Sequence, residues 1–304
     1  MKIFGKILAA LMFIAFSWVP ATQAANYTFK IIDVLGAQDT VAFAINNSGL
    51  VVGTYGVFAP NSGTGHGFVY NAGTISTFDA PNASGRTYAY GLNNAGQIVG
   101  EDRTDVYHGF LKVGEQYTPL DVPGAQASTS AHGINQTGKI VGKYDYGNEG
   151  TTLITHSFSH LAGGGYPTFA VTGATDTEAW GINDADQIVG YYFDSSYHGF
   201  LYDGQSFTYL NFPGATDTQA YKINNRGQIV GTYTLNGVIH GFILNFSTGK
   251  WETLDVPGAA QFVLAGINDL GQVVGGFMDN GHFRGFIATP KRGLSAVTEL
   301  LLLE

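Results

Sequence analysis

Carboxylate, histidine and arginine side chains are the groups in this 304-residue chain that could cleave a sugar polymer by hydrolysis or elimination. Two carboxyl groups roughly 5 to 10 Å apart can hydrolyse a glycosidic bond, and Glu178 and Asp217 are candidates for such a pair. A base with a nearby cation suits a lyase-type elimination; the candidate bases are His132 and Tyr90, and the candidate cations are Arg103 and Lys222. The sequence alone singles out no pair, so the identity of any catalytic group stays open.

Aromatic and charged residues also suit binding without catalysis, because aromatic rings stack on sugar faces. The candidate ligand-binding residues are Tyr90, His132, Trp180, Tyr221, Asp102, Arg103 and Asp176. Two alternatives remain open. In one, the aromatic members, which alternate with small residues, are packing groups between repeats. In the other, the acidic members form a solvated rim.

Four histidines precede Gly-Phe and suggest a metal site at first sight: they are His66, His108, His198 and His240. Strands lie about 4.8 Å apart, so copies in separate sheets stand too far apart to share one ion. We instead expect each His to bond a polar residue of the next strand: these are Asp79, Asp121, Asn211 and Asp255. Where Arg284 replaces the His, Asp33 is the expected partner. No cofactor is expected; the acidic rim would suit calcium, but no D-x-D-x-D loop supports it.

These residues belong to six internal repeats, whose recurring element is A-x-G-I-N-x-x-G-Q-I-V-G. The six copies span residues 42–53, 89–100, 131–142, 179–190, 220–231 and 264–275. Each repeat predicts four short strands with Asn-x-x-Gly and Asp-Gly turns and shows no helical periodicity. Four strands in about 44 residues is the size of a propeller blade. The sequence therefore predicts an all-β, six-bladed β-propeller whose ring is closed by the N-terminal strand.

The repeated G-I-N-x-x-G-Q-I-V-G and H-G-F elements resemble those of the HAF-repeat extracellular proteins. The resemblance covers residues 27 to 290. It implies a bacterial exported repeat protein with a propeller-like fold. It implies no reaction and carries over no catalytic residue.

The two ends of the chain do not carry the repeat. Lys2 and Lys6 precede an apolar run and small residues, which is typical of a secretory signal peptide over residues 1–24. The propeller is expected over 25–290 and a C-terminal tail over 291–304. These segments predict a secreted, periplasmic or cell-surface location without a stable membrane span.

Composition limits the partners that suit this chain. The net charge of −9 and the lack of a basic stripe argue against nucleic acid, and the lack of cysteine excludes disulfides. We therefore expect a monomeric binding module for a polysaccharide or an extracellular protein, using its loop face. A glycoside hydrolase or polysaccharide lyase on the same face, and a purely structural surface protein, are the alternatives.

Overall fold

The computed structural model describes residues 26–57, 63–81, 83–146 and 154–291. Its elements over these ranges are the strands β1 to β24. None of the described segments forms a helix of the length and hydropathy needed to cross a membrane. The predicted signal peptide and most of the predicted tail lie outside the described residues.

Four sheets have four strands each and follow the repeats. The first contains β2 (Asp39–Ile45), β3 (Val51–Gly56), β4 (Gly65–Asn71) and β5 (Thr74–Phe78), and the second contains β6 (Thr87–Leu92), β7 (Ile98–Arg103), β8 (Tyr107–Val113) and β9 (Gln116–Leu120). The third contains β18 (Asp217–Ile223), β19 (Gln228–Leu235), β20 (Val238–Asn245) and β21 (Lys250–Thr253). The last contains β1 (Tyr27–Ile32), β24 (His282–Pro290), β23 (Val273–Asp279) and β22 (Phe262–Ile267), in that order. The sequential neighbours pair antiparallel, as the short turns require.

Two repeats, those that contain residues 131–142 and 179–190 and are third and fourth along the chain, share one eight-stranded sheet. The prediction of six separate four-stranded blades is therefore wrong. This sheet contains β10 (Thr129–Ile134), β11 (Ile140–Tyr146), β12 (Ile154–His160), β13 (Thr168–Phe169), β14 (Asp176–Ile182), β15 (Ile188–Phe193), β16 (Tyr197–Tyr202) and β17 (Phe207–Leu210). One parallel pair, Thr155 with Asp176, joins β12 to β14. Similar parallel bridges, Gly65 with Arg86 and Tyr107 with Ser128, lie outside continuous ladders. The structure is thus a propeller of four blades and one larger sheet.

The N-terminal strand β1 lies on the outer edge of the last sheet. It pairs antiparallel with β24 over six residues, from Tyr27 with Pro290 to Ile32 with Gly285. The predicted ion pair is confirmed, because Arg284 Nη1 donates to an Asp33 carboxylate oxygen. The further prediction that this strand closes a ring of six equal blades is wrong, because the five sheets are unequal.

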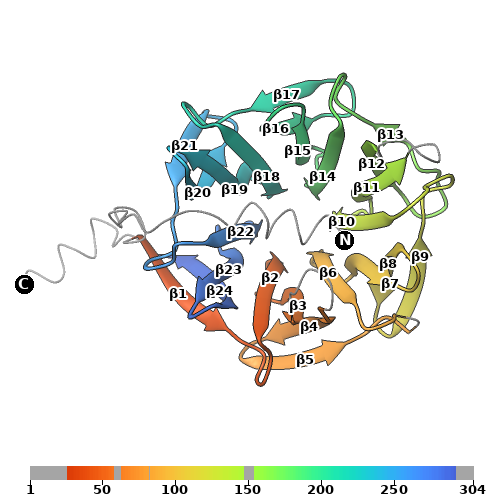
Figure 1. The fold of residues 1–304 in the computed structure, drawn as a ribbon, viewed down its shortest axis with the longest axis horizontal. Helices are drawn as coiled ribbons and strands as arrows, with labels where there is room; N and C mark the ends of the chain where they lie inside the picture. The colour runs from red at the N-terminus through yellow and green to blue at the C-terminus, as the bar shows by residue number, and fades with distance from the viewer. Residues whose placement is uncertain (1–25, 58–62, 82, 147–153, 292–304) are drawn as a thin grey trace, which may run out of the picture.

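The inner strands β2, β6, β10, β14, β18 and β22 surround a central axis, and outer strands such as β5, β9 and β17 form the perimeter (Figure 1). Each inner strand has a register irregularity near its middle. Between the inner strands and the perimeter, the Phe of each Gly-Phe pair is fully buried, as with Phe110 at 2% exposed. Gly100 permits this packing, because a Cβ there would lie 1.9 Å from Tyr88 O and 2.8 Å from the Phe110 ring.

Candidate functional site

The axis has two chemically different ends, set by the strand connections. The turns between the second and third strand of each repeat and the connections between repeats lie at one end, here called the loop face. The Asn-x-x-Gly turns lie at the other end, here called the Asn face. The two ends are opposite because successive strands of each sheet run antiparallel.

Between these ends, the six variable residues of the inner strands fill the axis. They are Phe43, Tyr90, His132, Trp180, Tyr221 and Ala265, and each is at most 5% exposed. Each lies at the register irregularity of its strand, where a bulge turns the side chain out of the regular alternation. The interpretation of these aromatic residues as packing groups is therefore confirmed at the level of burial.

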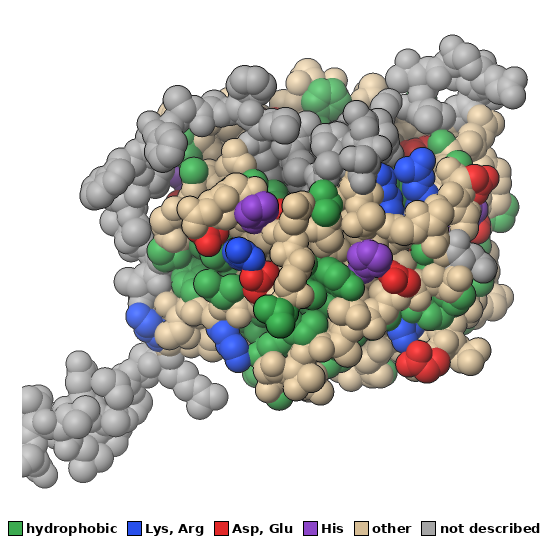
Figure 2. Space-filling view, turned by 60° about the horizontal axis from the view of Figure 1, so that its bottom comes forward, with side chains coloured by type: hydrophobic (Ala, Val, Ile, Leu, Met, Phe, Trp, Pro, Cys, Tyr) green, Lys and Arg blue, Asp and Glu red, His purple; other side chains and the backbone are tan. Residues whose placement is uncertain are grey.

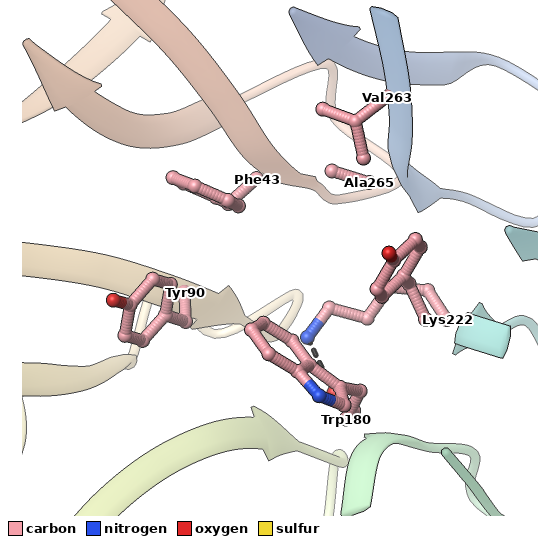
Figure 3. A pocket seen from close by; sticks show the side chains of 7 residues that line it. Phe43, Tyr90, Trp180, Lys222, Val263 and Ala265 are labelled. Atoms are coloured by element: carbon pink, nitrogen blue, oxygen red, sulfur yellow. Dashed lines mark hydrogen bonds between the residues drawn. The ribbon is translucent and has the colours of Figure 1, made fainter. Parts of the chain in front are cut away.

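The axial rings touch one another and leave little open space. His132 stacks on Trp180 with ring centroids 3.9 Å apart, and Tyr90 meets both rings edge-on at 5.2 and 5.8 Å. A cavity of about 10 Å³ lies among Phe43, Tyr90, Trp180, Tyr221 and their neighbours (Figure 3). That volume is about one water molecule, so no sugar ring fits at the axis in this conformation.

Lys222 reaches into this cavity from β18, at a position where four of the other repeats have Gly. Its ammonium donates to Trp180 O at 2.6 Å (Figure 3) and also to His132 O. Burial lowers the pKa of Lys222 from 10.5 to about 7. One cation therefore bridges the backbones of β10 and β14 across the axis.

A buried carboxylic acid, Glu101, lies on β7 on the loop-face side of the axial rings. Tyr90 Oη donates to its Oε1 at 2.9 Å, and Ser130 Oγ donates to its Oε2. Burial raises the pKa of Glu101, although these hydrogen bonds and the charge of Lys143 oppose the rise. Glu101 is not among the candidates above. It replaces the Thr found at positions 54 and 232 of other repeats, and that replacement is the signal that would identify it.

A second buried carboxylate, Glu178, forms an ion pair with Lys143. The Lys143 Nζ to Glu178 Oε1 distance is 3.4 Å, and both side chains are at most 4% exposed. Tyr191 Oη donates to Glu178 Oε2 at 2.7 Å, and Trp180 Nε1 donates to the same oxygen at 3.3 Å. We expected Glu178 at the loop face, open to a ligand. The structure instead buries it against Lys143 of the preceding repeat, a contact that the pattern within one repeat does not show.

His132, the candidate base, is fully buried in the same region. Its Nδ1–H donates to Ala179 O at 2.9 Å, while Nε2 has no hydrogen-bond partner among the described residues. Burial and the charge of Lys143 hold the pKa of His132 well below its usual value. A neutral imidazole suits a general base, but the described residues enclose His132 completely.

Asp102 and Arg103, predicted to bind one ligand together, turn to opposite faces of the second sheet. Asp102 lies opposite His108 in the register of β7 and β8, and Arg103 lies opposite Tyr107. Successive strand residues point to opposite faces. Partial burial raises the pKa of Asp102, which the charge of His108 opposes.

Arg103 belongs to a cluster of two arginines and one tyrosine. Its guanidinium lies over the Tyr107 ring, 5.7 Å from the centroid. Arg86 Nη1 donates to Tyr107 Oη at 2.8 Å, and Arg86 Nε donates to Gly63 O at 2.9 Å. All three side chains are half-buried on the loop face. We call these three residues the Arg–Tyr cluster; among them, only Arg103 was predicted to bind a ligand.

The acidic candidates Asp176 and Asp217 begin inner strands β14 and β18. Asp217 Oδ1 accepts a hydrogen bond from Tyr197 N of the preceding repeat at 3.1 Å, as Asp39 Oδ1 does from Phe283 N at 2.8 Å. Asp176 lies at the parallel pair with Thr155. Both candidates thus lie at joints between neighbouring repeats, and neither lies in the axial cavity.

The histidines of the outer wall form the predicted pairs within each repeat. The Nδ1 atoms lie 2.8 to 3.1 Å from oxygens of Asp79, Asp121, Asn211 and Asp255, in repeat order. Figure 2 shows a histidine beside an acidic side chain on this wall, and scattered basic residues. No group of three or more His, Asp or Glu side chains within the described ranges is placed to hold a metal ion.

The Asn face is built from one repeated interaction. The first Asn of each turn donates its Nδ2–H to the backbone O of the corresponding Asn in the next repeat, at 2.9 to 3.4 Å. The last of these bonds runs from Asn268 to Asn46, so the chain of six bonds is continuous around the axis. Within each turn Oδ1 accepts from the amides two and four residues on, as at Asn224. The predicted turn role is confirmed, and the bonds between repeats are additional.

Comparison with known proteins identifies the fold only. No family model matches the chain, and no curated protein matches it. It is similar to streptogramin B lyase (TM-score 0.51, 10% identity, 90% of this chain and 100% of that chain) and to a putative gluconolactonase (0.52, 11%, 89% and 95%). It is also similar to a Hadza microbial sialidase (0.53, 12%, 84% and 66%). These likenesses support the propeller fold; the resemblance to HAF-repeat proteins stays a sequence-based prediction.

Proposed function

We propose that this chain is an exported binding module that holds a polysaccharide or a cell-surface partner against its loop face. One observation carries the proposal: the side chains that differ between repeats gather on and beneath the loop face. The Arg–Tyr cluster lies there at the surface, and Glu101, Lys143 and Glu178 lie below it. The Asn face repeats the same hydrogen bonds in all six turns, which is what a scaffold requires. Export rests on the sequence of residues 1–24 alone.

Binding fits the geometry better than catalysis does. A catalytic acid or base must lie within about 3 Å of the proton that it transfers. Glu101 and Glu178 are each 2% exposed and already accept hydrogen bonds from protein groups. The axial cavity of about 10 Å³ admits no sugar. Tyr107, in contrast, is only half-buried, so part of its ring is accessible to a ligand at the loop face.

Gel filtration of the purified chain with neutral and acidic polysaccharides tests this proposal. We expect an intact polymer that co-elutes with the protein. Tyr107→Ala should weaken this co-elution, whereas Tyr209→Ala, which removes a 53% exposed tyrosine on the outer strand β17, should not. Absence of co-elution with every polymer would favour a structural or protein-binding role and contradict polysaccharide binding.

A hydrolase or lyase is the second candidate function, and one observation favours it. Two buried carboxyl groups near the axis have different partners: hydroxyl groups surround Glu101, and Lys143 pairs with Glu178. Different environments are what separate an acid from a base. This function requires the axial rings to move apart. The same gel-filtration experiment distinguishes it, because a hydrolase or lyase would shorten the polymer and Glu101→Gln would abolish that shortening.

A further inference from the structure

The Arg–Tyr cluster places two cations around one aromatic ring on a chain of net charge −9. Arg86 approaches Tyr107 through its hydroxyl group, and Arg103 approaches the same residue over the ring face. The two arginines come from different segments: an isolated parallel bridge fixes Arg86, just before β6, beside Gly65, and β7 ends at Arg103. The backbone supports this placement, because Arg103 N donates to Arg86 O at 3.0 Å.

Neither guanidinium has a carboxylate partner among the described residues. Arg284, in comparison, pairs with Asp33. On the other face of the second sheet, Asp105 and Asp121 both bond His108. The charge of the buried Glu101 reaches Arg86, but the Glu101 oxygens accept hydrogen bonds from Tyr90 and Ser130. The Arg–Tyr cluster therefore holds two positive charges close together without a carboxylate paired to either guanidinium.

An anion that bridges the two arginines would relieve their mutual repulsion. Guanidinium groups present paired N–H donors that match the two oxygens of a carboxylate. Arg86 uses one N–H of Nε and one of Nη1, so about three of the five N–H donors of its guanidinium remain for an anion. Arg103 makes no side-chain hydrogen bond within the described chain and keeps its full set of donors.

We infer that the Arg–Tyr cluster is an anion subsite that binds the carboxylate of an acidic sugar residue, with the sugar ring beside Tyr107. This inference rests on the proposed function and assigns its substrate class: a polysaccharide that contains uronic acid. The chain's negative charge repels such a polymer elsewhere, so this local positive patch would fix where and in which orientation the polymer binds.

The test compares probes that differ only in the carboxylate. Polygalacturonate and the same polymer after reduction of its carboxylates to alcohols are each run with the purified chain, and affinity is measured by titration. We expect the acidic polymer to bind at least about tenfold more tightly, as a charge-assisted hydrogen-bond pair implies. Binding should weaken as salt concentration rises.

Three variants locate the subsite. Arg103→Ala should remove the preference for the acidic polymer, and Arg103→Lys should restore part of it, because lysine keeps the charge but not the paired donors. Arg226→Ala is the matched control, since Arg226 is an exposed arginine on the Asn face with no carboxylate within ion-pair distance in the described chain. It should bind as the unsubstituted chain does.

The outcomes separate the subsite from the function. The subsite would be overturned if both polymers bound equally, or if the Arg103→Ala variant still preferred the acidic polymer. The binding function would stand in either case. Failure of every polymer to bind would overturn both. A preference lost in Arg226→Ala as well as in Arg103→Ala would show that net charge rather than the Arg–Tyr cluster is responsible, and would also overturn the subsite.

Discussion

The two ends of the propeller axis solve the same packing problem in opposite ways. On the Asn face, six equivalent asparagines make six equivalent bonds from one repeat to the next. On the loop-face side, the corresponding layer contains Glu101, Ser130, Lys143 and Glu178 on one flank and Val41 and Val263 on the other. Repetition at one end supplies the scaffold, and variation at the other end leaves room for a specific role.

The buried polar residues on the loop-face side, here called the polar flank, carry a free-energy cost that the Asn face does not. Removing charges from water is unfavourable unless each finds a close partner. The structure satisfies Glu178 through Lys143, Tyr191 and Trp180, and Glu101 through Tyr90 and Ser130. A protein that needed only a filled axis would use apolar residues, as β2 and β22 do at Val41 and Val263. The buried charges are therefore the best sign that the loop-face end has a function.

The largest effect is expected from breaking the ion pair on this polar flank. Lys143→Met removes the cation and leaves Glu178 charged in the core. We expect the free energy of unfolding to fall by about 3–5 kcal/mol, as for other buried pairs that lose one partner. Chemical denaturation measures this change.

The double variant Lys143→Met, Glu178→Gln is the control for this first prediction. It removes both charges, so it should lose less stability than the sum of the two single variants. Strictly additive losses would mean that the two side chains do not stabilise each other. The contrast between the two ends of the axis would then not depend on buried charge.

The next effect is expected on the Asn face. Asn224→Ala removes three hydrogen bonds within its turn and one to Asn268 O of the next repeat. At about 1 kcal/mol each, the loss in unfolding free energy is about 4 kcal/mol. Asn94→Ala is the matched control, since this exposed neighbour accepts one bond, from Asn47 N. Equal losses in the two variants would contradict a special role for the buried asparagines.

The local features of both ends could be predicted from the sequence, and the contacts between repeats could not. Turn asparagines, the pairs such as His66–Asp79, and the Arg284–Asp33 pair depend on residues whose strand neighbours the repeat pattern fixes. The shared sheet of the third and fourth repeats depends on one parallel pair, Thr155 with Asp176, between strands of different repeats. Six separate blades were therefore predicted where five sheets occur.

The buried charges were missed for the same reason. Glu178 was predicted at the loop face because it stands just before the repeated A-x-G-I-N element of its own repeat. It is buried because it forms an ion pair with Lys143, which belongs to the preceding repeat of the same sheet. The residue after each V-G pair is Thr, Tyr or Gly in the other four repeats, so Glu101 and Lys143 are distinguished together as the two charged residues at this position.

A smaller effect is expected from Lys222, which lies between the two ends of the axis. The folded chain holds its pKa at about 7, below the ordinary 10.5. Between these values the unfolded chain keeps a proton that the folded chain has released, so the free energy of unfolding should rise with pH above about 7. Below about pH 7 Lys222 should contribute no slope. Its axial neighbour Tyr90 does not interfere, because burial raises the pKa of Tyr90 well above its usual value.

Lys222→Met should lose this rise while keeping a side chain of similar length at the axis. Urea denaturation of both proteins from pH 6 to pH 9.5 measures the difference. If the two stability profiles stayed parallel over that range, Lys222 would remain protonated at the axis, held by the carbonyls of His132 and Trp180. The axis would then contain a permanent cation.

The smallest effect is expected at His108, where one repeat departs from the others on the outer wall. Partial burial opposes the charged form, but hydrogen bonds to Asp105 and Asp121 raise the pKa of His108. Because the folded pKa is raised, the stabilisation is full below the unfolded pKa and is lost as pH rises through the folded value.

Asp121→Asn should lower the His108 midpoint in an NMR titration. Asp79→Asn, which affects the equivalent pair with His66, should leave it unchanged. A His108 midpoint that Asp121→Asn does not move would show that Asp105 alone sets its charge, and repeat 2 would then differ from its neighbours through its loop rather than through its repeated wall.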